Sequence, residues 1–338
     1  MPELFWLVGA VVVFALVFDF INGFHDTANA IAASVSTGVL SPRKAIAGAA
    51  VLNFVGAMIG TEVAKTMGKG IIDTSILQTG SAAGQWVVIA ALLSAIAWNL
   101  LTWWWGLPSS SSHAIIGGLI GAAVAGFGVD KLHWDGIERI FLFLVASPIV
   151  GGLVSFTLMV LLMWLFRPAS PVTVTNLFRP LQIFAAGFMA LSHGTNDAQK
   201  AMGIITLALF TGHFIPDFVV PLYVKIAAAI AMALGTRAGG WKIIKTRGTR
   251  IVKLQPVNGF ASDTAAALTV STASAFGLPV STTHVVSGAI MGVGATRRVS
   301  AVRWGVAGNM MIAWVLTIPL TATLAAAVFL GMRYILKF

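Results

Sequence analysis

The sequence predicts an all-α polytopic membrane protein with an inverted-repeat fold, and three observations carry this prediction. Hydrophobic residues make up 58% of the chain and charged residues only 9%, whereas a soluble domain carries about 25% charged residues. Apolar segments of about 20 residues, the length that crosses a bilayer, follow one another along the chain. The same polar motifs also occur twice. Lipid is therefore the expected solvent for most of the surface.

Composition also excludes several classes of protein. There is no cysteine, so disulfides and thiolate metal sites are ruled out. The formal net charge is +10, which in a soluble protein would suggest a nucleic-acid partner. Here the basic residues lie in loops between apolar segments, where membrane topology places them, and no nucleic-acid partner is expected.

Five apolar segments fill the first half of the chain. The first is interrupted near Asp19–Asp26, where polar residues break the apolar pattern. The fourth is short and rich in glycine, so a helical hairpin or a half-spanning helix fits it as well as a full crossing. The segments lie at roughly 4–38, 44–66, 86–105, 109–127 and 138–166.

Five further segments follow in the second half, with the same features. The first is interrupted near Ser192–Asp197, and the fourth is again short. The segments lie at roughly 179–212, 218–236, 259–276, 280–296 and 301–335. We expect one transmembrane domain of about 10–12 membrane segments, with interrupted helices. Its parts are repeat 1 at about 1–166, a central linker at about 167–178 and repeat 2 at about 179–338.

The two halves share their motifs at a nearly constant offset of 171 residues, as between Asp26 and Asp197. The matched stretches are 23–26 with 194–197, 106–108 with 277–279, 110–113 with 281–284 and, after a drift in the offset, 60–61 with 235–236. Five crossings per half would give the halves opposite orientations. Inverted repeats with interrupted helices are typical of secondary transporters. The alternative is a chance recurrence of small residues, which two motifs at one offset make improbable.

The distribution of basic residues predicts the orientation. If the N-terminus lies outside and every segment crosses, most loop Lys and Arg residues fall on the inside, as the positive-inside rule requires. The basic loop 237–253 is then the longest cytoplasmic connection. We expect a multi-pass protein of the bacterial inner membrane with both termini outside.

The first chemical motif interrupts the first apolar segment. Asp19, His25 and Asp26 are ionisable residues at membrane depth, where each charge costs about 2.5–3.5 kcal/mol on insertion scales. Asn22-Gly23 favours a turn with positive φ, so we expect the helix to break there. The freed carbonyls and Asp26 suit a small cation, and the freed N–H groups suit an anion. Alternatively, the two acids cap helices or lie at the interface.

The second motif, Ser192–Lys200, is the repeat partner of the first. Asp197 matches Asp26, and Asn196 adds an amide. Lys200 occupies the position equivalent to Asn29. It could offset the acids or serve the anion, or it could equally snorkel to the cytoplasmic face.

The third motif occurs as Gly106–His113 and again as Gly277–His284. Proline followed by hydroxyl residues is typical of a helix N-terminus, which presents N–H groups and a positive dipole end. Two such ends would form a pocket of donors for a tetrahedral oxyanion. The alternative is ordinary capping and packing through small residues. The expected anion-binding residues are Ser109, Ser110, Ser111, Ser112, Ser281, Thr282, Thr283, Asn29, Asn196 and Gln199.

Other polar residues complete the predicted site. We expect Asp26, Asp197, Asn22 and Asp263 to bind coupling cations. His113, His284, Lys200 and Asn53 are candidates for the pathway or a proton relay, although interhelical hydrogen bonding explains such residues as well. Metal ligands remain undetermined from the sequence.

At these motifs the chain resembles the inorganic phosphate transporter (PiT) family of phosphate–cation symporters, in its bacterial low-affinity branch. Phe20–Ala30 and Ser192–Lys200 resemble the two signature repeats, and Trp98–Trp103 and Gly277–His284 are similarly close. The resemblance implies a secondary active transporter, not an enzyme, that imports inorganic phosphate by alternating access. It further implies a homodimer, coupling to H⁺ or Na⁺, and metal–phosphate complexes as candidate substrates. Animal relatives carry Glu where Asn53 aligns, which leaves the number of coupled cations open.

Three other functions can be compared with phosphate transport by their chemistry: transport of another oxyanion, hydrolysis and passive conduction. Another tetrahedral oxyanion such as sulfate fits the same fold, but carboxylates near the anion favour phosphate because only phosphate can donate a hydrogen bond. A hydrolase using Ser112 and His113 is disfavoured, because adjacent helical residues point about 100° apart. A passive channel would show no concentrative uptake. No enzymatic cofactor is expected.

Overall fold

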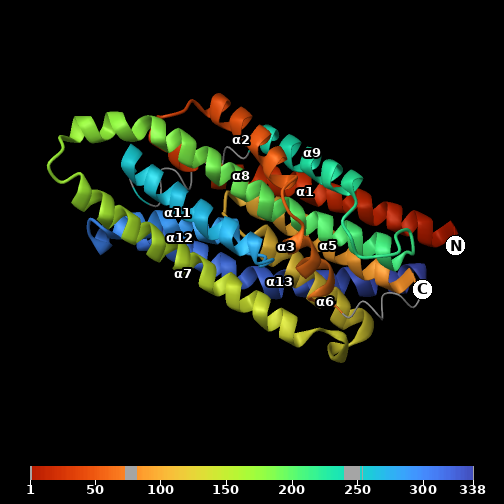
Figure 1. Cartoon of the computed structure of the whole chain (residues 1–338). Coiled ribbons are helices and arrows are strands. Elements are labelled where there is room, and N and C mark those ends of the chain that lie inside the picture. The colour runs from red at the N-terminus through yellow and green to blue at the C-terminus, as the bar shows by residue number, and fades with distance from the viewer. Residues whose placement is uncertain (1, 73–81, 240–251, 253, 338) are drawn as a thin grey trace.

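The computed structural model describes residues 2–72, 82–239, 252 and 254–337. Long helices form an elongated bundle, and both ends of the chain lie at the same end of it (Figure 1). The helices are α1 (Pro2–Ser36), α2 (Pro42–Ala57), α3 (Glu62–Lys69), α5 (Ala82–Trp105), α6 (Ser111–Phe127), α7 (Trp134–Leu165), α8 (Pro171–Thr211), α9 (Leu222–Ala238), α11 (Pro256–Ala275), α12 (Thr282–Ala295) and α13 (Trp304–Leu336), with the 3-10 turns η1 (Val129–Lys131) and η2 (Val299–Ala301).

Five of the described helices, namely α1, α5, α7, α8 and α13, are long and apolar enough to cross a membrane. The bent pair α2 and α3, with 72° between the two helices, adds a sixth if it counts as one span. The all-helical membrane fold is thus confirmed. The expected 10–12 segments included the shorter helices α6, α9, α11 and α12 as well. Most of the basic loop 237–253 lies outside the described residues.

The predicted interruptions of the two motif helices are wrong, because α1 and α8 are each continuous through the motif. The motif glycines serve packing rather than a turn. A Cβ added at Gly23 would lie 2.4 Å from the Met232 carbonyl oxygen, and one at Gly194 would lie 2.2 Å from that of Asn53. Each glycine therefore lets the backbone of a neighbouring helix approach closely.

The predicted linker at 167–178 is also mostly wrong, because α8 begins at Pro171. Ser170 caps this helix by accepting from the Thr173 N–H, and proline suits the first helical position because its missing N–H is not needed there. Only residues 166–170 connect α7 to α8.

The two halves pack reciprocally. Helix α1 packs against α9 while α8 packs against α2, and α6 packs against α13 while α12 packs against α7. The glycine contacts recur between the halves: Gly117 lies against Ile318 and Gly288 against Pro148, with the glycines 171 residues apart and their partners 170. Each half thus supplies partners for the other, which keeps the matching motifs at one level of the bundle.

The same contacts correct one repeat pairing. Gly56 lies against Leu191, and Gly235 lies against Phe20. Gly56, rather than Gly60, is therefore the counterpart of Gly235. Sequence alone favoured Gly60 because Thr61 follows it as Thr236 follows Gly235.

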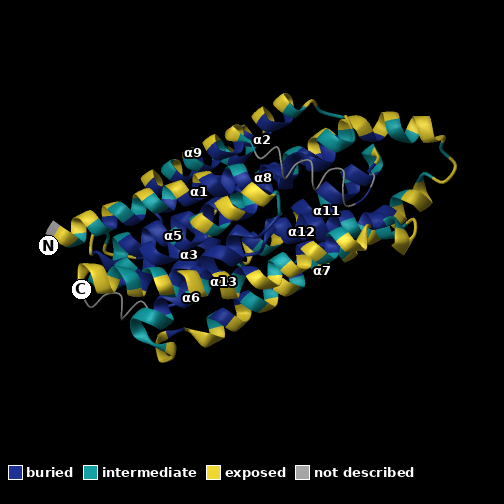
Figure 2. Ribbon diagram, turned by 180° about the vertical axis from the view of Figure 1, so that it is seen from behind, coloured by how far each residue is buried: buried dark blue, intermediate teal, exposed yellow. Residues whose placement is uncertain are grey.

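Helices α1 and α8 run antiparallel, and the parts that carry the motifs lie in the interior of the bundle (Figure 1). Val8 lies beside Gly212 at one end, and the Thr37 hydroxyl donates to Gln182 at the other. Figure 2 shows buried residues concentrated along the inside and exposed ones on the outer faces. Large apolar side chains such as Trp104, Trp164 and Phe184 are exposed. Outward apolar and inward polar residues are the pattern of a lipid-facing bundle.

Candidate functional site

The N-termini of α6 and α12 meet in the interior. Ser110 caps α6 by accepting from the His113 N–H, and Ser281 caps α12 by accepting from the His284 N–H. The two histidine ring centroids are 4.4 Å apart, and the Ser112 hydroxyl donates to the Val280 carbonyl at 3.1 Å. The sequence prediction of two adjacent serine- and threonine-rich helix ends agrees with this geometry.

A left-handed residue precedes each of these ends. Gly106 and Gly277 both have φ of 68°, a conformation that glycine adopts without steric cost. The chain can therefore leave the preceding helix, turn sharply and begin the next helix in the protein interior. The Gly-Leu-Pro sequence shared by both halves encodes this turn.

The N-terminus of α12 joins the two motif acids. The Thr283 hydroxyl donates to Asp26 Oδ1 at 3.2 Å, and the Thr282 hydroxyl donates to Asp197 Oδ2 at 3.0 Å. The Asn29 amide donates to both threonine hydroxyls, at 3.1 Å and 3.3 Å. One helix end thus bridges an acid from each half, and all five side chains are buried.

Each acid also has a basic neighbour on its own helix. His25 Nδ1 lies 2.9 Å from Asp26 Oδ1, and its Nε2 lies 3.2 Å from the Thr102 hydroxyl on α5. The Lys200 ammonium donates to Asp197 Oδ1, and His193 Nε2 lies 3.1 Å from Asp197 Oδ2. Asp197 therefore has two basic partners, whereas Asp26 has one.

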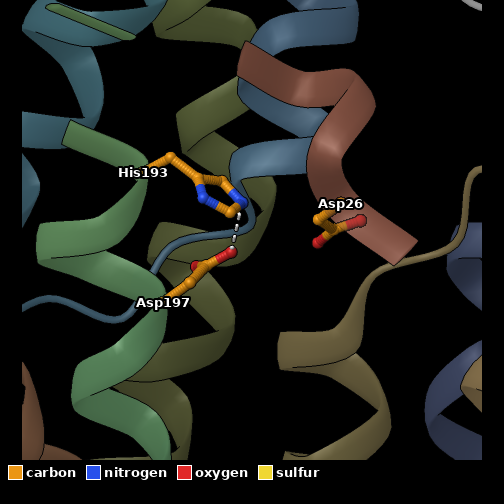
Figure 3. Close-up of side chains that lie close together, drawn as sticks. All are labelled: Asp26, His193 and Asp197. Carbon is orange, nitrogen blue, oxygen red and sulfur yellow. Dashed lines mark ion pairs between the residues drawn. The ribbon is translucent and has the colours of Figure 1, made fainter. Parts of the chain in front are cut away.

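The ligand atoms of Asp26, His193 and Asp197 all lie within 4.8 Å of one another. Figure 3 shows Asp26 across a narrow space from the His193–Asp197 ion pair. His193 Nδ1 is 3.2 Å from Asn53 Oδ1, which can only accept. The Nε2 atom of His193 then faces the Asp197 carboxylate. This contact is attractive only if Nε2 carries a proton or if a cation lies between the two groups. The space favours positive charge.

The hydroxyl groups at the N-terminus of α6 make different contacts from those at the N-terminus of α12. The Ser111 hydroxyl is buried without a hydrogen-bond partner, and the Ser109 hydroxyl lies 2.7 Å from that of Thr102. Ser112 donates to a carbonyl instead of an acid. Ser111 is therefore a predicted anion ligand whose hydroxyl is still available.

Several predicted residues have other roles. Both ends of the Gln199 amide hold the connection between α2 and α3, because its Oε1 accepts from the Ala64 N–H and its Nε2 donates to the Ile59 carbonyl. The Asn196 amide nitrogen donates to the Ser274 hydroxyl. These hydrogen bonds give the Gln199 amide and the Asn196 nitrogen structural roles instead of contact with an anion.

The other predicted cation ligands are buried and incompletely bonded. Neither side-chain atom of Asn22 has a hydrogen-bond partner, and Oδ2 of Asp263 on α11 also lacks one. Buried polar atoms without partners are uncommon in folded proteins, so these atoms remain available to a water or an ion. His284 stacks on Trp314 with ring centroids 3.9 Å apart, which gives its ring a packing role.

His25 and His193 lie in the predicted motifs without an assigned role, and Thr102 and Thr236 lie outside them. Two of these had a usable signal: His25 directly precedes Asp26, and His193 lies one helical turn before Asp197. Thr236 accepts from the Asn53 amide at 2.8 Å and so fixes the amide that contacts His193. That role depends on contacts between distant helices and has no local signal.

Comparisons with known proteins agree on one class. The profile of the phosphate transporter family matches residues 22–174 and 166–325. A protein of Bacillus subtilis described as "Probable low-affinity inorganic phosphate transporter" is 52% identical, with 94% of each chain covered. One of Rhizobium meliloti with the same description is 48% identical, over 95% of this chain and 94% of the relative. A solved structure described as "The sodium-dependent phosphate transporter" is 27% identical with a TM-score of 0.87, covering 97% of this chain and 99% of the other.

Proposed function

The chain belongs to the phosphate transporter family, and from this premise we propose that it imports inorganic phosphate by cation symport through alternating access. The single observation that carries the proposal is the α12 N-terminus, whose Thr282 and Thr283 hydroxyls contact Asp197 and Asp26. An anion-binding element and two cation-binding acids thus form one buried unit.

The phosphate position follows from the available donors. A helix N-terminus supplies N–H groups and a positive dipole end for an anion. The ends of α6 and α12 lie together, with the unpartnered Ser111 hydroxyl on one and the paired threonines on the other. We place phosphate between these ends, with Asn29 completing the set. A protonated phosphate oxygen can donate to a carboxylate, which sulfate cannot do.

Charge explains the need for coupling. Moving one negative charge into a negative interior costs about 2.3 kcal/mol at 100 mV, and a dianion roughly twice that. Asp26, Asp197 and the phosphate would together bring negative charge into a buried site, so cations must accompany them. We propose that these acids draw H⁺ or Na⁺ into the site, and the same space could accept the metal of a metal–phosphate complex.

The geometry supports alternating access between opposed halves. Asp26 is 2% exposed and Asp197 is 1% exposed, so the site corresponds to a closed state. The packing of α1 on α9 and α8 on α2 offers two equivalent bundles that could rock about the site. We propose an inverted repeat for this reason. A homodimer in the bacterial inner membrane, with both termini outside, completes the proposal.

The test is uptake of ³²P-labelled phosphate by the purified full chain in liposomes, with proton and sodium gradients imposed separately. Asp26→Asn and Asp197→Asn should each abolish gradient-driven uptake. Asp135→Asn makes the same change at an exposed position of α7 and should leave uptake intact. Intact coupling in both site variants would refute the cation assignment. Competition by excess sulfate identifies the preferred anion.

A further inference from the structure

One position beside the site carries a charge in the second half and an uncharged amide in the first. Lys200 occupies the place of Asn29, three residues after the motif acid in each half. Its side chain is fully buried, and its ammonium donates to Asp197 Oδ1. A lysine at this depth could snorkel to the surface, but this one is directed to the central acid.

The first-half counterpart offers the opposite chemistry. The Asn29 nitrogen donates to Thr282 and Thr283, while its Oδ1 is buried with no hydrogen-bond partner. A carboxylate and a free amide oxygen one turn apart on a helix are oxygen ligands of the kind a small hard cation binds. At the equivalent place beside Asp197, the second half has a positive charge of its own.

A second broken position supports this reading. Asp19 lies in α1 where the second half has Ala190. Asp19 is fully buried, and neither of its carboxylate oxygens has a hydrogen-bond partner. Compared with its counterpart, the first motif helix therefore has one additional acid, and the second has one additional ammonium group.

We infer that the Lys200 ammonium is a tethered cation that permanently fills the second-half cation position, so that only the first-half position at Asp26 and Asn29 takes up a coupling cation. The inference rests on the proposed phosphate symport. An ammonium carries the charge of one monovalent cation and binds carboxylate oxygen directly. Because it is covalently attached, it does not have to be captured from solution in each cycle.

The assignment has a definite consequence for coupling. The transporter should use one fewer mobile cation per phosphate than a repeat with asparagine at both positions. Lys200→Asn copies the first-half residue and removes the tethered charge from Asp197. The vacated place then offers an amide oxygen beside a carboxylate and should recruit a cation from solution.

The experiment measures labelled-phosphate uptake into liposomes against external Na⁺, with choline as the replacement cation. Lys200→Asn should make uptake at least tenfold dependent on Na⁺ and raise the Hill slope for Na⁺ by one relative to the unmodified chain. Lys200→Arg keeps the charge and should keep the cation dependence of the unmodified chain. Equal Na⁺ dependence of the asparagine variant and the unmodified chain would overturn the inference.

A second measurement covers a variant that no longer transports. In detergent and without phosphate, Na⁺ should raise the Tm of Lys200→Asn by several degrees more than that of the unmodified chain, since only the variant has a vacant second position. The absence of such a difference would overturn the inference. Failure of the unmodified chain to transport phosphate under any gradient would overturn the proposed function instead, and the Tm comparison would still decide the role of Lys200.

Discussion

The two repeat-related motifs use one scaffold but hold their acids differently. Asp26 contacts His25 and Thr283, whereas Asp197 contacts Lys200, His193 and Thr282. Gly23 and Gly194, at equivalent positions of the two motif helices, both lie against the backbone of a neighbouring helix. The backbone is therefore close to symmetric, and the asymmetry of charge comes from a few substituted side chains. The side chains at matching positions therefore differ more than the backbone that holds them.

The largest expected effect is a difference in stability between variants of the two motif acids. Asp197→Asn leaves the Lys200 ammonium buried without its partner, and removal of one member of a buried ion pair costs about 3–5 kcal/mol. Asp26→Asn leaves no lysine without an ion-pair partner and should destabilise the protein much less. Thermal unfolding of the detergent-solubilised protein measures the difference.

The double variant Asp197→Asn/Lys200→Asn is the control for this prediction. Removing both charges should restore most of the stability lost in the single variant, because the unpaired charge is the cause. Equal unfolding temperatures for the two single aspartate variants would show that the ion pair does not distinguish the halves.

The helix ends provide the next test. Thr282→Val and Thr283→Val each remove the hydroxyl that donates to a motif acid, and a hydrogen bond to a charged group contributes about 1.5–3 kcal/mol. Ser111→Ala removes a hydroxyl without a partner and should leave stability unchanged while lowering phosphate affinity. Unfolding temperature and the KM for uptake separate the two outcomes. An equal loss of stability for all three variants would contradict the asymmetry of the two ends.

The smallest effects should show where the halves are alike. Gly23→Ala and Gly194→Ala both push a methyl group into the backbone of a neighbouring helix, and overpacking typically costs about 1–3 kcal/mol. The two losses should be similar. Gly9→Ala is the matched control on α1, because a Cβ there meets nothing within 4 Å. A loss at only one motif glycine would show that the scaffold itself is asymmetric.

The sequence predicted the features that depend on local pattern. Apolar segments, the repeat offset and the two capped helix ends all follow from residue type and spacing, and Asp26, Asp197 and Thr282 do meet. The break at Asn22-Gly23 failed because the same dipeptide suits a turn or a close helix contact, and only the neighbouring Met232 backbone decides between them.

Roles that depend on a distant helix were beyond local reasoning. Gln199 lies in the motif but bonds to the chain near Ile59 and Ala64, about 140 residues earlier. His193 is oriented by Asn53, also distant in sequence. Such contacts are fixed by how the halves interlock, and neither half alone contains the information.

The exchange of partners between the halves also sets the order in which the protein can be built. Helix α6 presents Gly117 and Gly121 to α13, more than 190 residues further along the chain. During synthesis α6 must therefore wait in the membrane without its partner. The serine-bearing end of α6 therefore gains its contacts with α12 only after the second half has been synthesised.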